Sequence, residues 1–305
     1  MGFVDWICFN KKDVMMFVIN PFTGKLDCVG NSAPTPPPPP VEEYITFVDP
    51  AVEAICVANW GANGKLSYTQ ASVVSDLGYV FAGNIDIISF DELQYFTALN
   101  GIGNNAFQGC SSLTSIIIPN SVTSIGNSSF KECLVLTSVI ISNTLISVGP
   151  SAFQGCTNLA SVNLPNSITS IGVAAFANCT NLASVNLPNS ITSIGDAAFA
   201  SCANLASVII PNTLTSIGNS TFIYCTGLTS VIIPSSVTSI GDAFNNCSGI
   251  TSMTVESIIP PSLGPAGFTG YNIATTHIYV PAESVDAYKA ATDWNIHAPF
   301  ITAII

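Results

Sequence analysis

The chain has 305 residues, of which 48% are hydrophobic and only 8% are charged, and its net charge is −12. This balance excludes intrinsic disorder, which requires low hydrophobicity and many charges. All six basic residues are lysines, and without the planar fork of arginine we expect no nucleic-acid partner. Polar residues and glycines interrupt every apolar run. No run therefore reaches the roughly 18–20 residues of a membrane-spanning helix, and we expect no membrane insertion.

The first segment, residues 1–33, contains two apolar runs, at Met15–Asn20 and Leu26–Val29. A turn rich in Pro, Thr and Gly separates them, which predicts a two-stranded hairpin. Charged residues interrupt residues 1–20, so we find no signal-peptide pattern and expect no conventional secretion. A lone hairpin is marginally stable and needs a partner surface, either another protein or the remainder of this chain. The candidate docking residues are Phe17, Val18, Ile19, Asn20, Pro21 and Phe22.

A polyproline run follows, with the sequence PTPPPPP at residues 34–40. Such a run is an extended spacer and marks a domain boundary. The predicted organisation is a docking segment at 1–33, a linker at 34–41, an N-terminal cap at 42–88, a repeat region at 89–252 and a C-terminal cap at 253–305.

The N-terminal cap region reads as helix, loop, helix. VDPAVEAICVANW offers a proline near a helix start, and SYTQASVVS begins a second helix. The loop between them resembles an EF-hand loop, with Asn59, Gly61, Asn63 and Gly64 followed by Gln70 at the twelfth place. Calcium loops need several carboxylates, and none of these positions is acidic. A metal-free helical cap is therefore favoured over a calcium site.

The centre of the chain is an internal repeat. Two residue types recur with steps of 23 five times and then 22, which is the signature of a solenoid. The phenylalanines are Phe107, Phe130, Phe153, Phe176, Phe199, Phe222 and Phe244, and the cysteines are Cys110, Cys133, Cys156, Cys179, Cys202, Cys225 and Cys247.

One repeat, LASVNLPNSITSIGDAAFASCAN at residues 182–204, shows how each unit folds. Its first piece predicts a strand with Val185 inward and Ser184 and Asn186 outward. A second short strand, ITSIG, ends at a turn glycine. The DAAFASC piece predicts one helical turn that buries Phe199 and Cys202. We therefore expect a β-rich α/β solenoid.

The recurring LTSVIIP, SVTSIG, AF and C pattern resembles the BspA-like leucine-rich repeats, over about residues 89–305. The resemblance implies a stacked solenoid and a role in adhesion. The run IYVPAESVDAYKAATDW resembles the closing segment of family members, with a strand at His277–Val280 and a helix from Glu283 or Ser284 to about Thr292. Such a segment would cap the open end of the stack.

The outward strand positions form two rows that we take as a candidate binding face. Small polar residues also stack well in parallel ladders for purely structural reasons, but isoleucines left in water favour a contact with a saccharide or protein. The serine row is Ser115, Ser138, Ser161, Ser184, Ser207, Ser230 and Ser252, and the second row is Ile117, Ile140, Asn163, Asn186, Ile209 and Ile232.

Catalytic chemistry is not expected. Glycosidases and lyases need converging acid and base groups, whereas Lys131, Glu132, Asp196 and Asp242 are the charged residues between 103 and 252. The cysteine column favours small buried hydrophobes over disulfides, because parallel side-chain vectors do not suit disulfide geometry. No C-x-x-C pair suggests zinc, and we expect no cofactor.

Two histidines, His277 and His297, lie near Asp286 and Asp293 in the C-terminal region. A metal or general-base site is conceivable there, but surface or packing roles are favoured for isolated histidines.

The NPFTGKLD leader followed by a proline spacer resembles N-terminal segments of virion appendage proteins of tailed phages of gut Bacteroidales. This resemblance implies docking to other virion proteins. We therefore expect a non-enzymatic virion appendage, a tail fibre or a capsid or tail decoration, that presents its solenoid to a host-surface protein or glycan. A purely structural virion spacer and a bacterial cell-surface adhesin are the alternatives, and a homo-oligomer is possible in each case.

Overall fold

The computed structural model describes residues 43–265, 268–270 and 276–304, together with short strands before residue 30. The chain divides into two compact units, Met1–Glu43 and Tyr44–Ile305. In the first unit, β3 (Met16–Ile19) pairs antiparallel with β4 (Leu26–Val29), which confirms the hairpin.

The first unit also contains β1 (Phe9–Asn10) and β2 (Asp13–Val14), which form a second antiparallel pair that the sequence analysis missed. The side chains of the six candidate docking residues lie outside the described residues, as does the polyproline run.

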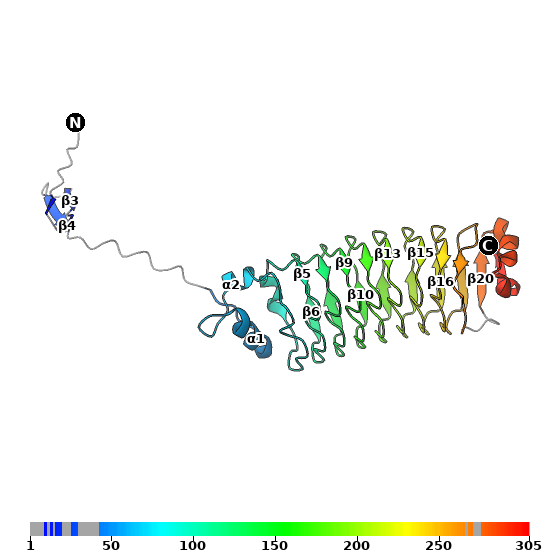
Figure 1. Cartoon of the computed structure of the whole chain (residues 1–305), viewed down its shortest axis with the longest axis horizontal. Helices are drawn as coiled ribbons and strands as arrows, with labels where there is room; N and C mark the ends of the chain where they lie inside the picture. Colours follow the sequence, from blue (N-terminus) through cyan, green and yellow to red (C-terminus); the bar gives the residue numbers. More distant parts are fainter. Residues whose placement is uncertain are drawn as a thin grey trace, which may run out of the picture. The chain divides into compact units, whose positions relative to one another are not determined.

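The second unit is a β-solenoid of about nine turns, in which short strands stack in two parallel rows (Figure 1). The first row contains β6 (Ser115–Ile117), β8 (Ser138–Ile140), β10 (Ser161–Asn163), β12 (Ser184–Asn186), β14 (Ser207–Ile209), β16 (Ser230–Ile233), β18 (Ser252–Val255), β20 (His277–Val280) and β21 (Ile301–Ala303). The second row contains β5 (Gly101–Ile102), β7 (Ser124–Ile125), β9 (Ser147–Val148), β11 (Ser170–Ile171), β13 (Ser193–Ile194), β15 (Ser216–Ile217), β17 (Ser239–Ile240) and β19 (Ser262–Leu263).

The strands alternate as the repeat predicts. In β12, Val185 is buried between the exposed Ser184 and Asn186. Parallel pairing sets Ser161 beside Ser184, so each residue type meets its counterpart one turn away. A one-residue slip would turn the buried valine to solvent, so the alternation fixes the register.

The third piece of each repeat differs from the prediction of a helical turn, which is wrong. Residues 196–201 form consecutive tight turns, with Ala197 at φ 56° and Ser201 at φ 60°. Alternate backbone N–H groups of this segment donate to the next turn of the solenoid: the N–H of Phe199, for example, donates to the Thr221 carbonyl at 2.9 Å. Helix content is low, and the α/β description is not confirmed.

The core of the solenoid is a column of stacked phenylalanine rings. The rings of Phe130 and Phe153 lie 5.2 Å apart with an interplanar angle of 7°, and the other neighbours from Phe107 to Phe244 stack alike. Each ring is buried. The 23-residue step therefore places one aromatic layer in every turn.

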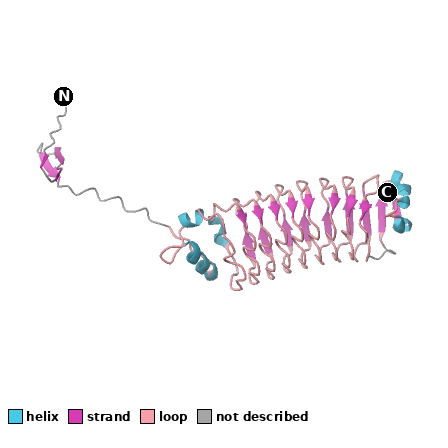
Figure 2. Cartoon of the chain, in the orientation of Figure 1, coloured by secondary structure: helices cyan, strands magenta, loops and turns pink. Residues whose placement is uncertain are grey.

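Helices lie at the two ends of the stack (Figure 2). At one end the predicted helices are present, and Trp60 packs edge-on against Phe96 with ring centroids 5.6 Å apart. At the other end the Trp294 Nε1–H donates to the Pro261 carbonyl at 2.7 Å. These segments are α1 (Pro50–Trp60), α2 (Tyr68–Ser72), η1 (Asp91–Tyr95), η2 (Ala282–Ser284), α3 (Val285–Ala290) and η3 (Asn295–Phe300). Their role as caps stays a prediction, as do the domain boundaries.

Asp49 ties the start of α1 to the first turns. Its carboxylate accepts hydrogen bonds from the N–H groups of Ala51 and Val52 in the helix and of Ile88 and Ser89 further along the chain. Burial alone would raise the pKa of Asp49, but these four donors outweigh it and hold the pKa below its usual range.

In the described part of the chain, no helix combines the length and the apolar character needed to span a bilayer.

Candidate functional site

The serine row runs along the outer side of the first row of strands. Each of its residues opens a strand and is followed by a buried residue, so the serine side chain points away from the core. Parallel register places Ser184 between Ser161 and Ser207, and Ser230 beside Ser207 and Ser252. The serines are exposed in the middle of the row and half-buried at its two ends.

The second row lies two residues further along the same strands. Ile209 is 79% exposed and Ile140 is 60% exposed, and Asn163 and Asn186 are exposed between them. We call the two rows together the ladder face. The structure brings all the candidate binding residues onto this face, and its binding role stays a prediction.

The ladder face extends further than the sequence analysis expected. Ser252 pairs with His277, and Thr254 pairs with Tyr279, so the strand β20 continues both rows. The rings of His277 and Tyr279 lie 6.2 Å apart with an interplanar angle of 16°. The sequence analysis found this strand without aligning it with the repeats. An alignment of HIY with the preceding SMT would have shown that the rows continue.

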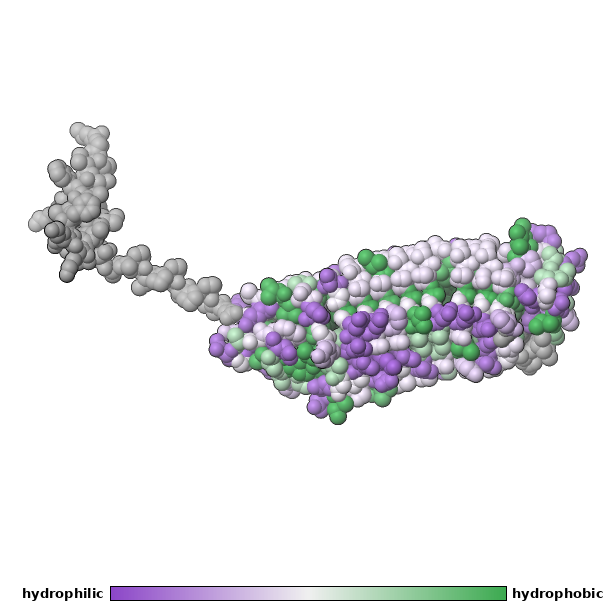
Figure 3. Space-filling view, in the orientation of Figure 1, coloured by the Kyte–Doolittle hydropathy of each residue, from purple (hydrophilic) through white to green (hydrophobic). Residues whose placement is uncertain are grey.

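From Ser115 to Ile232, the two rows of the ladder face consist of serine, isoleucine and asparagine, which are all uncharged. Lys131 and Glu132 lie on a turn segment, where they form a surface ion pair at 3.8 Å. The Asp196 carboxylate accepts from the N–H of Asn219 one turn away. Much of the surface of the stacked turns is near white in the hydropathy colouring, with separate purple and green patches (Figure 3).

The family of this chain follows from the repeat itself. The profile of the BspA type leucine-rich repeat region matches residues 79–179 and 149–274, with six copies. Together these matches span well over half of the chain. The chain belongs to the BspA type leucine-rich repeat family. Proteins of this kind are typically non-enzymatic binding or adhesion proteins and are often found at the cell surface.

Several solved structures of leucine-rich repeat proteins are similar to this chain over part or all of its length. A leucine-rich repeat protein of T. pallidum is 31% identical over 50% of this chain and 72% of its own length, with a TM-score of 0.48. A leucine-rich repeat protein of Bacteroides ovatus is 21% identical over 100% of this chain and 82% of its own, also with a TM-score of 0.48. A leucine-rich cell surface protein of Faecalibacterium prausnitzii is 20% identical over 58% and 65%, with a TM-score of 0.30. No curated protein matches the chain.

The repeat cysteines are buried and free of disulfides, as predicted. The structure adds a role in stacking, because each thiol donates to the carbonyl of the phenylalanine in the preceding turn. The Cys156 Sγ lies 3.1 Å from the Phe130 oxygen, and the other six repeat thiols bond in the same way. Burial raises the pKa of Cys110 to about 11 and that of Cys156 to about 12.

We expect the seven repeat thiols to resist a maleimide in the native protein and to react fully after denaturation. Thiolates are the reactive species, and burial both raises the pKa and blocks access. Peptide mass mapping of native and denatured samples, labelled at the same pH, checks this. Labelling of the native protein at the repeat cysteines, or a disulfide between two of them, would contradict it.

The EF-hand-like loop is built as a turn between two helices. Ala62 and Lys65 bridge across it, and Gly64 has φ 75°. The side chain of Gln70, at the twelfth place, accepts from the Ser67 N–H in a capping box that starts α2. That glutamine is thus engaged in helix capping. Across the described residues, no group of three or more His, Cys, Asp or Glu side chains is arranged to hold a metal.

The two histidines lie in different environments. His277 is exposed on the ladder face, whereas His297 is buried and packs edge-on against Phe268 with ring centroids 5.7 Å apart. Burial lowers the pKa of His297, which favours the neutral ring at pH 7. The structure thus packs His297 against Phe268, whereas Asp286 and Asp293 are exposed.

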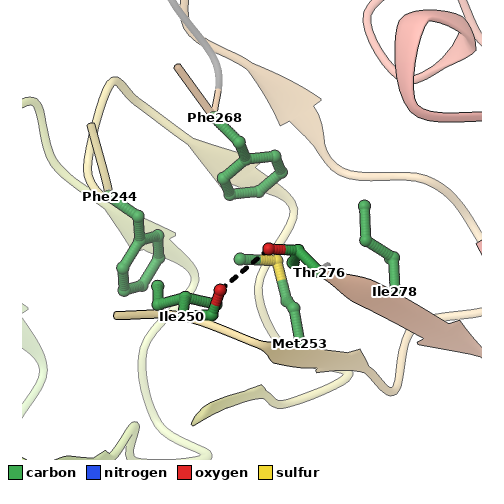
Figure 4. A pocket seen from close by; sticks show the side chains of 6 residues that line it. All are labelled: Phe244, Ile250, Met253, Phe268, Thr276 and Ile278. Carbon is green, nitrogen blue, oxygen red and sulfur yellow. Dashed lines mark hydrogen bonds between the residues drawn. The ribbon is translucent and has the colours of Figure 1, made fainter. Parts of the chain in front are cut away.

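A small apolar pocket lies where the last repeat meets β20. Phe244, Phe268, Met253 and Ile278 line it together with Ile250 and Thr276 (Figure 4). The Thr276 hydroxyl donates to the Ile250 carbonyl at 2.8 Å. The lining of this pocket is typical of a packing gap in the core, because no group of polar side chains converges there to orient a ligand.

Proposed function

We propose that this BspA type protein is a non-enzymatic adhesion component of a phage virion. Residues 1–33 dock it to other virion proteins, and the solenoid presents the ladder face to a host-surface protein or glycan. The observation that carries the binding role is the ladder face, where isoleucines as exposed as Ile209, at 79%, lie beside uncharged hydroxyl and amide groups. Such a surface suits a neutral partner that offers both apolar and hydrogen-bonding groups.

The docking role is supported by the first compact unit. Its β3–β4 hairpin has four residues in each strand, and a hairpin of this size is marginally stable alone. A partner that adds a strand to its edge would supply the missing hydrogen bonds. In this proposal, residues 34–40 link the docking segment to the solenoid.

A bacterial cell-surface adhesin is the second candidate. The family supports it, because BspA type leucine-rich repeat proteins are often cell-surface proteins. The same ladder face would then contact another cell or the extracellular matrix. A purely structural virion spacer is the third reading, and it predicts that the solenoid binds no host surface.

Deletion of residues 1–33 is expected to abolish incorporation into phage particles while leaving the melting temperature unchanged. The solenoid buries its own aromatic column, and Tyr44–Ile305 forms a separate compact unit. Mass spectrometry of purified particles measures incorporation, and circular dichroism measures melting. The deleted chain should still bind susceptible cells and compete with phage adsorption.

Each part of the proposal fails on a different result. Absence of the full chain from purified particles, with the chain found on bacterial cells instead, would favour the surface adhesin. Incorporation of the deleted chain would contradict docking by residues 1–33. Phage adsorption that is unaffected by saturating protein would favour the spacer. Ile209→Lys, on the ladder face, should weaken the competition with phage adsorption, and Val173→Lys, on an exposed turn outside that face, is its matched control.

A further inference from the structure

From β6 to β16, the second row of the ladder face has an order that reads the same in both directions; Thr254 and Tyr279 continue the row beyond this stretch. Its residues are Ile, Ile, Asn, Asn, Ile and Ile, and the centre lies between the adjacent strands β10 and β12. The isoleucines on the two sides of this centre are exposed, at 39% and 60% on one side and 79% and 54% on the other. The row is Ile117, Ile140, Asn163, Asn186, Ile209 and Ile232.

We propose that the ladder face binds a second copy of this chain in an antiparallel, face-to-face dimer. A twofold axis parallel to the strands, in the plane between the two faces, would pass between β10 and β12. This rotation reverses the order of the turns and keeps the position along each strand. It places Ile140 opposite Ile209 of the second copy and Asn163 opposite Asn186, which is the self-complementarity that a twofold interface requires.

The serine row fits the same rotation. Because it contains only serine from Ser115 to Ser230, the reversed row again sets hydroxyl against hydroxyl, and isoleucines meet isoleucines beside it. A twofold axis along the stack would instead reverse the strands and set the serine row against the isoleucine row. Pairing of apolar with apolar and polar with polar groups therefore selects the antiparallel arrangement.

Charge does not oppose this contact. The rows carry no ionisable side chain between Ser115 and Ile232, although the chain as a whole has a net charge of −12. The nearby charged residues Lys131, Glu132 and Asp196 belong to the turn segments. Two copies can thus approach at this face without setting like charges directly opposite one another, which is destabilising between strands.

The size of the face sets the expected strength of the dimer. Six strands spaced at about 4.8 Å give a strip of roughly 30 Å along the stack. A strip of this length and three residues in width is smaller than the ~800 Å² per partner of a standard stable interface. We therefore expect a dimer that forms at micromolar or higher concentration. A host ligand on the same face would compete with the second copy.

Site-specific cross-linking of the full chain tests the arrangement. Ile140→Cys and Ile209→Cys are made separately in a background with Cys8→Ser and Cys28→Ser, since the repeat cysteines and Cys56 are buried. A bismaleimide with a spacer of about 10 Å matches the usual distance between packed sheets. The mixture of the two variants is expected to give at least about tenfold more covalent dimer than either variant alone, because position 140 of one copy faces position 209 of the other.

The outcomes separate the dimer from the other occupants of the face. No 140–209 cross-link at about 100 µM protein would overturn the proposal and leave the face to a host ligand. Equal cross-linking of each variant with itself would overturn the antiparallel arrangement. Val173→Cys, on an exposed turn outside the ladder face, serves as the control for random collision. Phage adsorption is measured separately, so failure of the dimer leaves the proposed function standing.

A charge exchange gives a second measurement. At about 100 µM protein, sedimentation velocity should show a lower dimer fraction for Ile140→Lys and for Ile209→Glu than for the wild type. Their combination should restore it, because the introduced charges of opposite sign would face each other across the twofold axis. Both positions are exposed, so neither change disturbs the core. A double variant that stays as monomeric as the single variants would contradict the pairing.

Discussion

Replacement of Phe176 by alanine is expected to lower the free energy of unfolding by about 3–5 kcal/mol. The ring is fully buried and stacks on Phe153 at 5.2 Å and on Phe199 at 5.3 Å between centroids. Removal of the ring deletes both contacts and leaves a gap in the middle of the column. The gap cannot close easily, because hydrogen bonds between the backbones hold the turns on both sides at a fixed spacing. Urea denaturation followed by circular dichroism measures the loss.

Two variants control for this effect. Phe176→Leu keeps most of the apolar volume and should cost less than about 1.5 kcal/mol. Ile209→Ala removes a side chain that is 79% exposed and should stay within about 0.5 kcal/mol of the wild type. A loss for Phe176→Ala no larger than that for Ile209→Ala would show that the aromatic column does not carry the stability of the stack.

The solenoid could be predicted because the sequence pattern that encodes it repeats at a regular interval. The 23-residue step fixes which residues stack, so the positions of Phe176 and Cys179 in one turn give those in the next. The alternation around Val185 then fixes which strand residues face the core. Neither inference needs a long-range contact to be guessed, since each turn meets only its neighbours.

The turn segments could not be predicted from local preference. The AAF and FAS stretches favour a helix by propensity, yet Ala174 and Ala197 have φ of 53° and 56°. The N–H of Ala174 donates to the Asp196 carbonyl of the next turn at 2.9 Å, instead of to a residue four positions earlier. Stacking supplies a hydrogen bond for each turn, and this tertiary gain exceeds the cost of the left-handed conformation.

The sequence predicted which repeat residues lie on the ladder face, but it did not predict how far along the stack that face extends. The serine and isoleucine rows follow from the repeat, whereas His277 and Tyr279 join them through a segment that lacks the repeat pattern. An asparagine ladder was missed as well, in which the Asn181 side chain donates to that of Asn158 at 3.3 Å and accepts from Asn204. Such ladders depend on side-chain orientation, which spacing alone does not determine.

Replacement of Gly195 by alanine is expected to destabilise the protein by about 3 kcal/mol or more, at the upper end of overpacking effects. A Cβ at this position would meet the backbone atoms of Gly172 and Val173 in the preceding turn, closer than real Cβ contacts allow. The Gly195 N–H donates to the Ile171 carbonyl at 2.8 Å, so the two turns can separate only by losing hydrogen bonds. The glycine is thus required by the spacing of the stack and not by a positive φ.

Gly64→Ala is the matched control, because it isolates the conformational cost. Gly64 has φ 75°, and no atom lies within 4 Å of the added Cβ. Its replacement should therefore cost only the roughly 1–2 kcal/mol of a left-handed conformation. Thermal and urea unfolding of the two variants should separate them, with the larger loss at Gly195. Equal losses would mean that neighbouring turns yield to a methyl group, and the stack would then be held less tightly than the hydrogen bonds between its turns imply.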